Sequence, residues 1–171
     1  MASFGMASFG GAQPQASASV AIDSSTPWVA AADGNLALLQ QALQTLNLPL
    51  TAADQNGYTL LQAAASYSHL PILEWLVANC PDKSALMADV DNDGDTALHY
   101  ASTKEAAQFL LHHGADPNLR NSEGKTPLET KLTELMETMQ EKQEDGEADD
   151  EEDEELINLK GVIRFLQNPA Q

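Results

Sequence analysis

The sequence of 171 residues contains a single cysteine, Cys80, so no disulfide can form within the chain. Such chains are typical of reducing compartments, and we expect this protein in the cytoplasm, the nucleus or both. Pro81 follows Cys80 and no basic residue adjoins it, which favours a passive thiol over a nucleophile. No apolar run approaches the roughly 18 residues of a membrane span, so we expect no membrane partner.

Basic residues are also scarce. The chain has 8 Lys and Arg against 26 Asp and Glu, a formal net charge of −18, and residues 1–82 contain no Lys or Arg at all. A chain of this charge repels nucleic acid, and we expect no nucleic-acid partner. Any partner that it attracts electrostatically should be a basic protein.

The first residues, MASFGMASFGGAQPQASASVA, lack both the basic start and the apolar centre of a secretory signal. Their tandem MASFG is of low complexity. We expect residues 1–23 to form a disordered tail.

One phrase, [DN]-x-x-G-x-T-x-L, occurs three times, starting at residues 54, 91 and 121. Its glycine suits a turn with positive φ, and its threonine suits the cap of a helix. In two copies the threonine is followed three residues later by Gln62 or Glu129, the spacing of a capping box. Each copy therefore predicts a tight turn that leads into a helix.

This phrase, with the downstream stretch GADPN at 114–118, resembles the ankyrin repeat, a unit of about 33 residues with a β-turn and two helices. The resemblance implies an all-α solenoid of stacked helix-turn-helix units with β-turn fingers. We expect the domain to span 24–169, with repeats at about 24–53, 54–90, 91–120 and 121–169.

The repeats depart from the family phrase at several places. In the first repeat Trp28 stands where a histidine would fall, so this repeat is expected to act as an N-terminal cap. The second carries about four extra residues around 80–89. The third is three residues short at Thr103 and Lys104, which predicts a tighter loop between its helices.

The fourth repeat is unusual because its first helix, from Thr126, is long and an acidic segment follows it. We expect an acidic, solvated, disordered insert at about 143–155 and then an amphipathic helix over 155–168. The acidic loop residues are Glu147, Asp149, Asp150, Glu151, Glu152, Asp153 and Glu154. The expected buried stripe of the last helix is Leu156, Leu159, Val162, Ile163 and Leu166.

A second interpretation of residues 89–100 is a calcium loop, because Asp89, Asp91 and Asp93 precede Gly94 at EF-hand spacing. The twelfth position, which should hold a bidentate Glu, is Tyr100. The repeat phrase explains more of these residues, and a calcium-responsive protein remains the alternative.

No motif for catalysis, metal or cofactor binding is found, so we expect no enzyme, no catalytic residue, no metal and no cofactor. His69 and His99 fall on repeat positions, where the resemblance implies hydrogen bonds that brace neighbouring repeats. His112 and His113 precede Gly114 at a helix end, and adjacent residues there should not face each other.

The resemblance implies a non-enzymatic adaptor or scaffold for proteins. A sharper hypothesis is that it escorts a basic client such as a ribosomal protein or histone; the alternative for the acidic insert is solubility alone. We expect a monomer, because no large unpaired apolar face is evident. Its partner-binding residues would lie on the concave face, with Tyr58 and Tyr67 as exposed anchors. The candidates are Ala32, Asp33, Gln55, Asn56, Tyr58, Ser66, Tyr67, Asn92, Asp93, Asp95, Ser102, Lys104, Ser122, Glu123 and Lys125.

Overall fold

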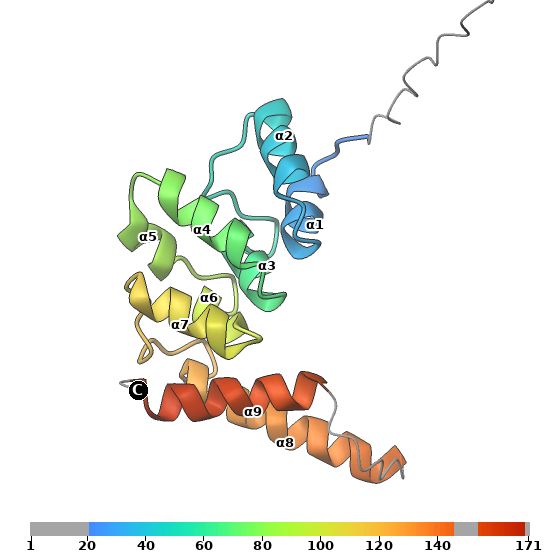
Figure 1. Cartoon of the computed structure of the whole chain (residues 1–171), viewed down its shortest axis with the longest axis vertical. Helices are drawn as coiled ribbons and strands as arrows, with labels where there is room; N and C mark the ends of the chain where they lie inside the picture. Colours follow the sequence, from blue (N-terminus) through green and yellow to red (C-terminus); the bar gives the residue numbers. More distant parts are fainter. Residues whose placement is uncertain (1–20, 146–153, 170–171) are drawn as a thin grey trace, which may run out of the picture.

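A computed structural model describes residues 21–145 and 154–169 (Figure 1). Its helices are α1 (Thr26–Ala32), α2 (Leu36–Leu46), α3 (Leu60–Ser66), α4 (Leu70–Asn79), α5 (Lys83–Ala88), α6 (Ala97–Tyr100), α7 (Lys104–His112), α8 (Pro127–Asp145) and α9 (Glu154–Gln167). Most of the expected tail lies outside the described residues. Asp23 does not belong to a tail, because its carboxylate accepts a hydrogen bond from the Thr26 backbone N–H at the start of α1 (3.0 Å).

The helices form a stack of pairs, from α1 and α2 at one end to α8 and α9 at the other (Figure 1). The first helices of the pairs, α1, α3, α6 and α8, contact one another in that order. Among the second helices, α7 contacts both α4 and α9. The fold is the all-α solenoid that the sequence predicts.

Tight turns with a positive-φ glycine connect the pairs, as the repeated phrase predicts. Gly57, Gly94 and Gly124 have φ values of 76°, 77° and 75°. Isolated antiparallel bridges close two of these turns, between Ala53 and Thr59 and between Val90 and Thr96.

Both predicted capping boxes are present. The Thr59 backbone N–H donates to the Gln62 side chain (2.6 Å), and the Gln62 N–H donates to the Thr59 hydroxyl (3.2 Å). Glu129 makes the equivalent pair of bonds with Thr126. These bonds satisfy backbone donors that a helix start leaves without partners.

A second set of hydrogen bonds ties each repeat to the next. In each case a side chain on the first helix binds the backbone carbonyl just before the first helix of the following repeat. The pairs are Trp28 Nε1 to Tyr58 O (2.7 Å), Gln62 Nε2 to Asp95 O (2.5 Å) and His99 Nε2 to Lys125 O (3.2 Å). Trp28 therefore does take the histidine's place, and His99 braces two repeats as the resemblance implies.

The extra residues of the second repeat form a helix, α5, that the sequence analysis did not predict. The Asp82 carboxylate caps it by accepting from the Ala85 N–H (3.0 Å). Leu86 and Met87 are buried in the core. In the shortened third repeat, α6 has four residues and Thr103 caps α7 directly, which is the tighter loop that was predicted.

The last helix pair is longer than the others (Figure 1). The helix α8 continues to Asp145 and α9 begins at Glu154, so the segment between them is shorter than the expected insert at 143–155. Residues 146–153, which include most of the predicted acidic loop, lie outside the described residues. Within the predicted stripe of α9, Leu156 is only half-buried and the other members are buried. Phe165, which the prediction omitted, is buried beside them.

Candidate functional site

The turn tips carry several candidate partner-binding residues and join into one continuous edge. The Asn92 N–H donates to the Asn56 carbonyl (2.9 Å), and the Asn92 side chain donates to the Gln55 carbonyl (3.3 Å). One turn further on, the Ser122 N–H donates to the Asp93 carbonyl (2.8 Å). All five side chains are exposed, so the tips present polar groups at the surface on a hydrogen-bonded backbone.

Beside this edge lies an open groove of about 800 Å³ that α3, α6, α8 and the start of α9 line. It unites Ser66, Tyr67 and Asp95 from the candidate face with Glu154 from the predicted acidic loop. The lining also contains Tyr100, Lys131, Glu134 and Glu155. The groove therefore joins two candidate regions that lie far apart in the sequence.

The two predicted tyrosine anchors differ. Tyr67 is 62% exposed and stacks beside the His69 ring, so an exposed aromatic does lie at the groove. The prediction that Tyr58 is an exposed anchor is wrong. Its hydroxyl bonds with Ser66 Oγ (2.8 Å), its ring meets the edge of Tyr100 at 5.1 Å, and burial raises its pKa.

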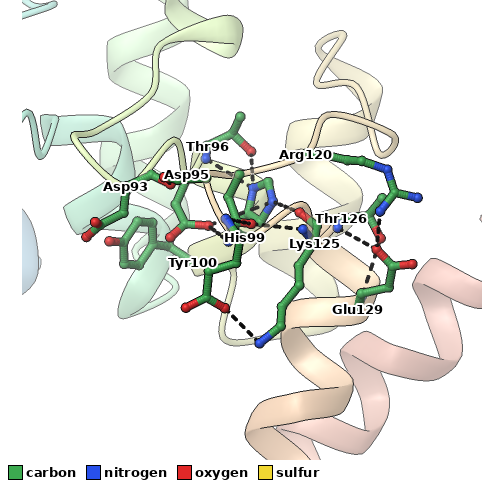
Figure 2. Close-up of polar contacts among 12 residues, drawn as sticks. Asp93, Asp95, Thr96, His99, Tyr100, Arg120, Lys125, Thr126 and Glu129 are labelled. Carbon is green, nitrogen blue, oxygen red and sulfur yellow. Dashed lines mark hydrogen bonds and ion pairs between the residues drawn. The ribbon is translucent and has the colours of Figure 1, made fainter.

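Asp95, one of the candidates for the concave face, belongs to the junction between repeats (Figure 2). Its carboxylate accepts from the Asn121 side chain (2.8 Å) and lies 3.8 Å from His99 Nε2. His99 is buried, and burial lowers its pKa; the Lys125 carbonyl and the Asp95 carboxylate oppose that shift. Asp95 thus contributes negative charge to the groove from a fixed position.

A smaller groove of about 550 Å³ lies along the same face and contains Asp93, Ser122, Glu123 and Lys125. Lys125 Nζ lies 2.8 Å from a Glu123 carboxylate oxygen, so its charge is partly neutralised within the site. The candidate residues of repeats three and four are thus neighbours.

Sequence reasoning missed the α8 residues of the grooves, among them Lys131 in the larger groove and Glu134 in both. Lys131 is buried, and its Nζ lies 2.8 Å from Glu134 Oε2. Their spacing of three residues on a predicted helix was a usable signal, since such residues share a face. The position of Glu155 in the groove depends on how α9 folds back, and no local pattern indicates it.

The calcium interpretation loses support because Asp91 already serves the turn. One oxygen accepts from the Asp93 and Asp95 N–H groups at 3.0 and 2.9 Å, and the other accepts from the Tyr100 hydroxyl at 2.6 Å. Asp89 is partly desolvated near Asp82, which raises its pKa. Within residues 21–145 and 154–169, no group of three or more His, Cys, Asp or Glu side chains is arranged to hold a metal ion.

His112 and His113 do touch, contrary to prediction, with their rings edge to face at 5.2 Å. His113 Nδ1 bonds with the Phe109 carbonyl (2.8 Å), and its ring packs on Phe109 at 4.1 Å. The contact is accounted for by packing at the helix end.

Of the helices in the described part of the chain, none has the length and apolar content to cross a membrane.

The stacked helix pairs, the glycine turns and the bonds between repeats define a repeat protein, in which each unit contacts its neighbours. The family model for ankyrin repeats (three copies) matches residues 28–129, and the chain belongs to the ankyrin repeat family. Ankyrin repeats are protein–protein interaction modules.

Among curated proteins, an ankyrin repeat-containing protein of Schizosaccharomyces pombe is 36% identical over 98 residues, 57% of this chain and 45% of its own length. The human ankyrin repeat and SOCS box protein 3 is 31% identical over 107 residues, 61% of this chain and 20% of its own. The E3 ubiquitin-protein ligase Ufd4 of Drosophila melanogaster is 31% identical over 94 residues, 53% of this chain and 3% of its own. The matches span less than half the length of these relatives.

Proposed function

We propose that this chain is a non-enzymatic adaptor that holds a basic segment of a partner protein in the larger groove. The supporting observation is the lining of that groove, which sets the exposed Tyr67 ring among the carboxylates of Asp95, Glu154 and Glu155. Carboxylates attract Lys and Arg, and an aromatic face adds a cation–π contact. Lys131, the one Lys or Arg of the described lining, is already paired with Glu134.

The acidic segment between α8 and α9 would assist the same partner. Its sequence contains Glu147 and five consecutive acids at 149–153, and the chain re-enters the described structure at Glu154, in the groove lining. Negative charge next to a binding groove speeds the approach of a basic protein and loses effect as salt is added. We propose that groove and segment together escort a basic client in the cytoplasm or nucleus.

The test compares capture of proteins from a cell extract by four forms of the full chain, at low and moderate salt, with identification by mass spectrometry. The groove variant is Glu154→Gln with Glu155→Gln, and the segment variant changes the acids from Glu147 to Asp153 to their amides. The matched control is Glu74→Gln with Glu105→Gln, two exposed acids on the outer helices α4 and α7.

The proposal predicts that a basic protein is retained by the parent and the control and is lost from the groove variant. Weaker capture by the segment variant than by the parent at low salt, with the difference disappearing at moderate salt, would assign the segment to steering. Retention of the same partners by the groove variant would show that the groove is not the binding site.

A further inference from the structure

The turn of the second repeat contains the one Asn-Gly pair of the sequence, Asn56 and Gly57. In such a pair the backbone nitrogen of the glycine can attack the side-chain amide carbon of the asparagine, because glycine has no Cβ to shield that nitrogen. The new carbon–nitrogen bond closes a succinimide ring, and the side-chain nitrogen leaves as ammonia with the proton of the glycine N–H. Water then opens the ring to aspartate or to isoaspartate, so the reaction needs no oxidant.

The side chain of Asn56 is held differently from those of other asparagines. Elsewhere the carboxamide takes part in a hydrogen bond, as in Asn35, Asn79, Asn92, Asn118 and Asn121. Asn56 is exposed at the turn tip, and among the described residues only its backbone is hydrogen-bonded. Its carboxamide is therefore free to turn toward the Gly57 nitrogen.

One hydrogen bond restrains the attacking nitrogen. The Gly57 N–H donates to the Asp54 carbonyl (3.0 Å), and it must leave that carbonyl before it can react. Exposed turns open locally at a much lower free energy than the core of a protein. We therefore expect the reaction at Asn56 to be slower than in an unfolded chain but faster than at the other asparagines.

The next turn shows what an aspartate does at this position. Its corresponding residue is Asp93, which also precedes a glycine, but a carboxylate is ionised at neutral pH and resists attack by a nucleophile. The Asp93 carbonyl accepts a hydrogen bond from the Ser122 N–H (2.8 Å). The Asn56 carbonyl accepts the equivalent bond from the Asn92 N–H (2.9 Å). An aspartate at position 56 can therefore keep the bond between the turns.

An isoaspartate cannot keep that bond. Its main chain runs through Cβ, which lengthens the turn by one carbon and releases the former backbone carbonyl as a carboxylate that no longer lies in the chain. The turns leave no room for the extra carbon, because even a Cβ on Gly57 would lie 3.0 Å from the Asn92 nitrogen. We propose that Asn56 is a site of spontaneous deamidation, and that its isoaspartate product releases the second turn from the third.

The test ages the full chain at mildly alkaline pH, because the Gly57 nitrogen attacks only after it loses its proton. Peptide mapping with electron-transfer fragmentation distinguishes aspartate from isoaspartate and measures conversion at every asparagine of the same sample. Conversion at Asn56 should be about tenfold or more faster than at Asn121, whose carboxamide must first leave its hydrogen bonds. Asn56→Gln is the matched control and should not convert, because its longer side chain closes a larger ring more slowly.

Hydrogen exchange of backbone amides, followed by NMR, tests the release of the turn. In the isoaspartate form the exchange of the Asn92 amide should rise about fivefold or more, the effect of losing one backbone hydrogen bond. The Ser122 amide, which makes the equivalent bond one turn further on, should not change. The Asn56→Asp variant should keep slow exchange at Asn92, since it contains only the product that fits the turn.

Three results would overturn the proposal. The first is conversion at Asn56 that is no faster than at Asn121. The second is conversion that occurs only after urea unfolds the chain, which would mean that the folded turn protects the site. The third is unchanged exchange of the Asn92 amide in the isoaspartate form. Because no client protein takes part, each result is independent of the groove proposal.

Discussion

The turns at Gly57 and Gly124 have nearly the same backbone, with φ of 76° and 75°, but different surroundings. A Cβ on Gly57 would lie 3.0 Å from the Asn92 nitrogen and the Asp91 Cα of the next turn, whereas one on Gly124 would meet nothing within 4 Å. Inside the stack the glycine is required both by its positive φ and by the closeness of the next turn, whereas at the end of the stack only the positive φ requires it. The neighbouring repeat therefore restricts the sequence of an inner turn but not that of the terminal turn.

The polar residue three positions after the threonine of each phrase also differs between an inner repeat, where it is His99, and the terminal repeat, where it is Glu129. His99 binds back to Thr96 and across to the Lys125 carbonyl. Glu129 also binds back to Thr126, but its other partner is Arg120, which lies just before its own turn (2.7 Å, Figure 2). Both of those side chains are about half exposed, and such pairs contribute little stability. The terminal repeat is therefore held by a buried junction on one side only, the His99–Lys125 bond to the repeat before it.

The largest effect should come from breaking that junction. His99→Ala removes a buried ring and leaves backbone groups of two repeats without partners, so we expect a loss of about 2 to 4 kcal/mol in the free energy of unfolding. His99→Gln should recover most of it, because Gln62 performs both functions in the preceding repeat. Urea unfolding of the three forms measures the difference. Equal losses in the two variants would mean that the ring's packing, not its hydrogen bonds, stabilises the junction.

An intermediate effect is expected at the turns. Gly57→Ala and Gly124→Ala both place an L residue at positive φ, which costs about 1 to 2 kcal/mol. Only Gly57→Ala also presses on backbone atoms of the next turn. We expect the loss at Gly57 to be about 1 kcal/mol larger, again by urea unfolding. If both substitutions cost the same, the inner turns have room that the contact distances do not indicate.

The smallest effect concerns pH. Burial lowers the pKa of His99, so the unfolded chain binds a proton at this residue more readily than the folded chain does. Stability is then present above the unfolded pKa, about 6.5, and is lost as the pH falls through it toward the folded value. Between about pH 7.5 and 5.5 the melting temperature should fall more for the parent than for His99→Gln. Parallel curves would indicate that groups other than His99 set the dependence.

Local patterns predicted the parts of the fold that depend on short stretches of chain. The spacing of Thr59 and Gln62 predicted the capping box, and the glycine of each phrase predicted a left-handed turn. The burial of Tyr58 was not predictable in this way, since it depends on Tyr100 arriving from the next repeat. The helix α5 was missed because its six residues are too few for a clear period.

The sequence by itself determined the family, the turns, the helix starts and the acidic character, because each arises from residues a few positions apart or from composition. Only the tertiary structure decided which of those residues share a surface. It placed Glu154 and Glu155 in one groove with Tyr67 and left Met136 and Met139 uncovered at the end of the stack. The physical reason is that a solenoid makes its surfaces from neighbouring repeats, so a residue's surroundings depend on how the units stack and on where the stacking stops.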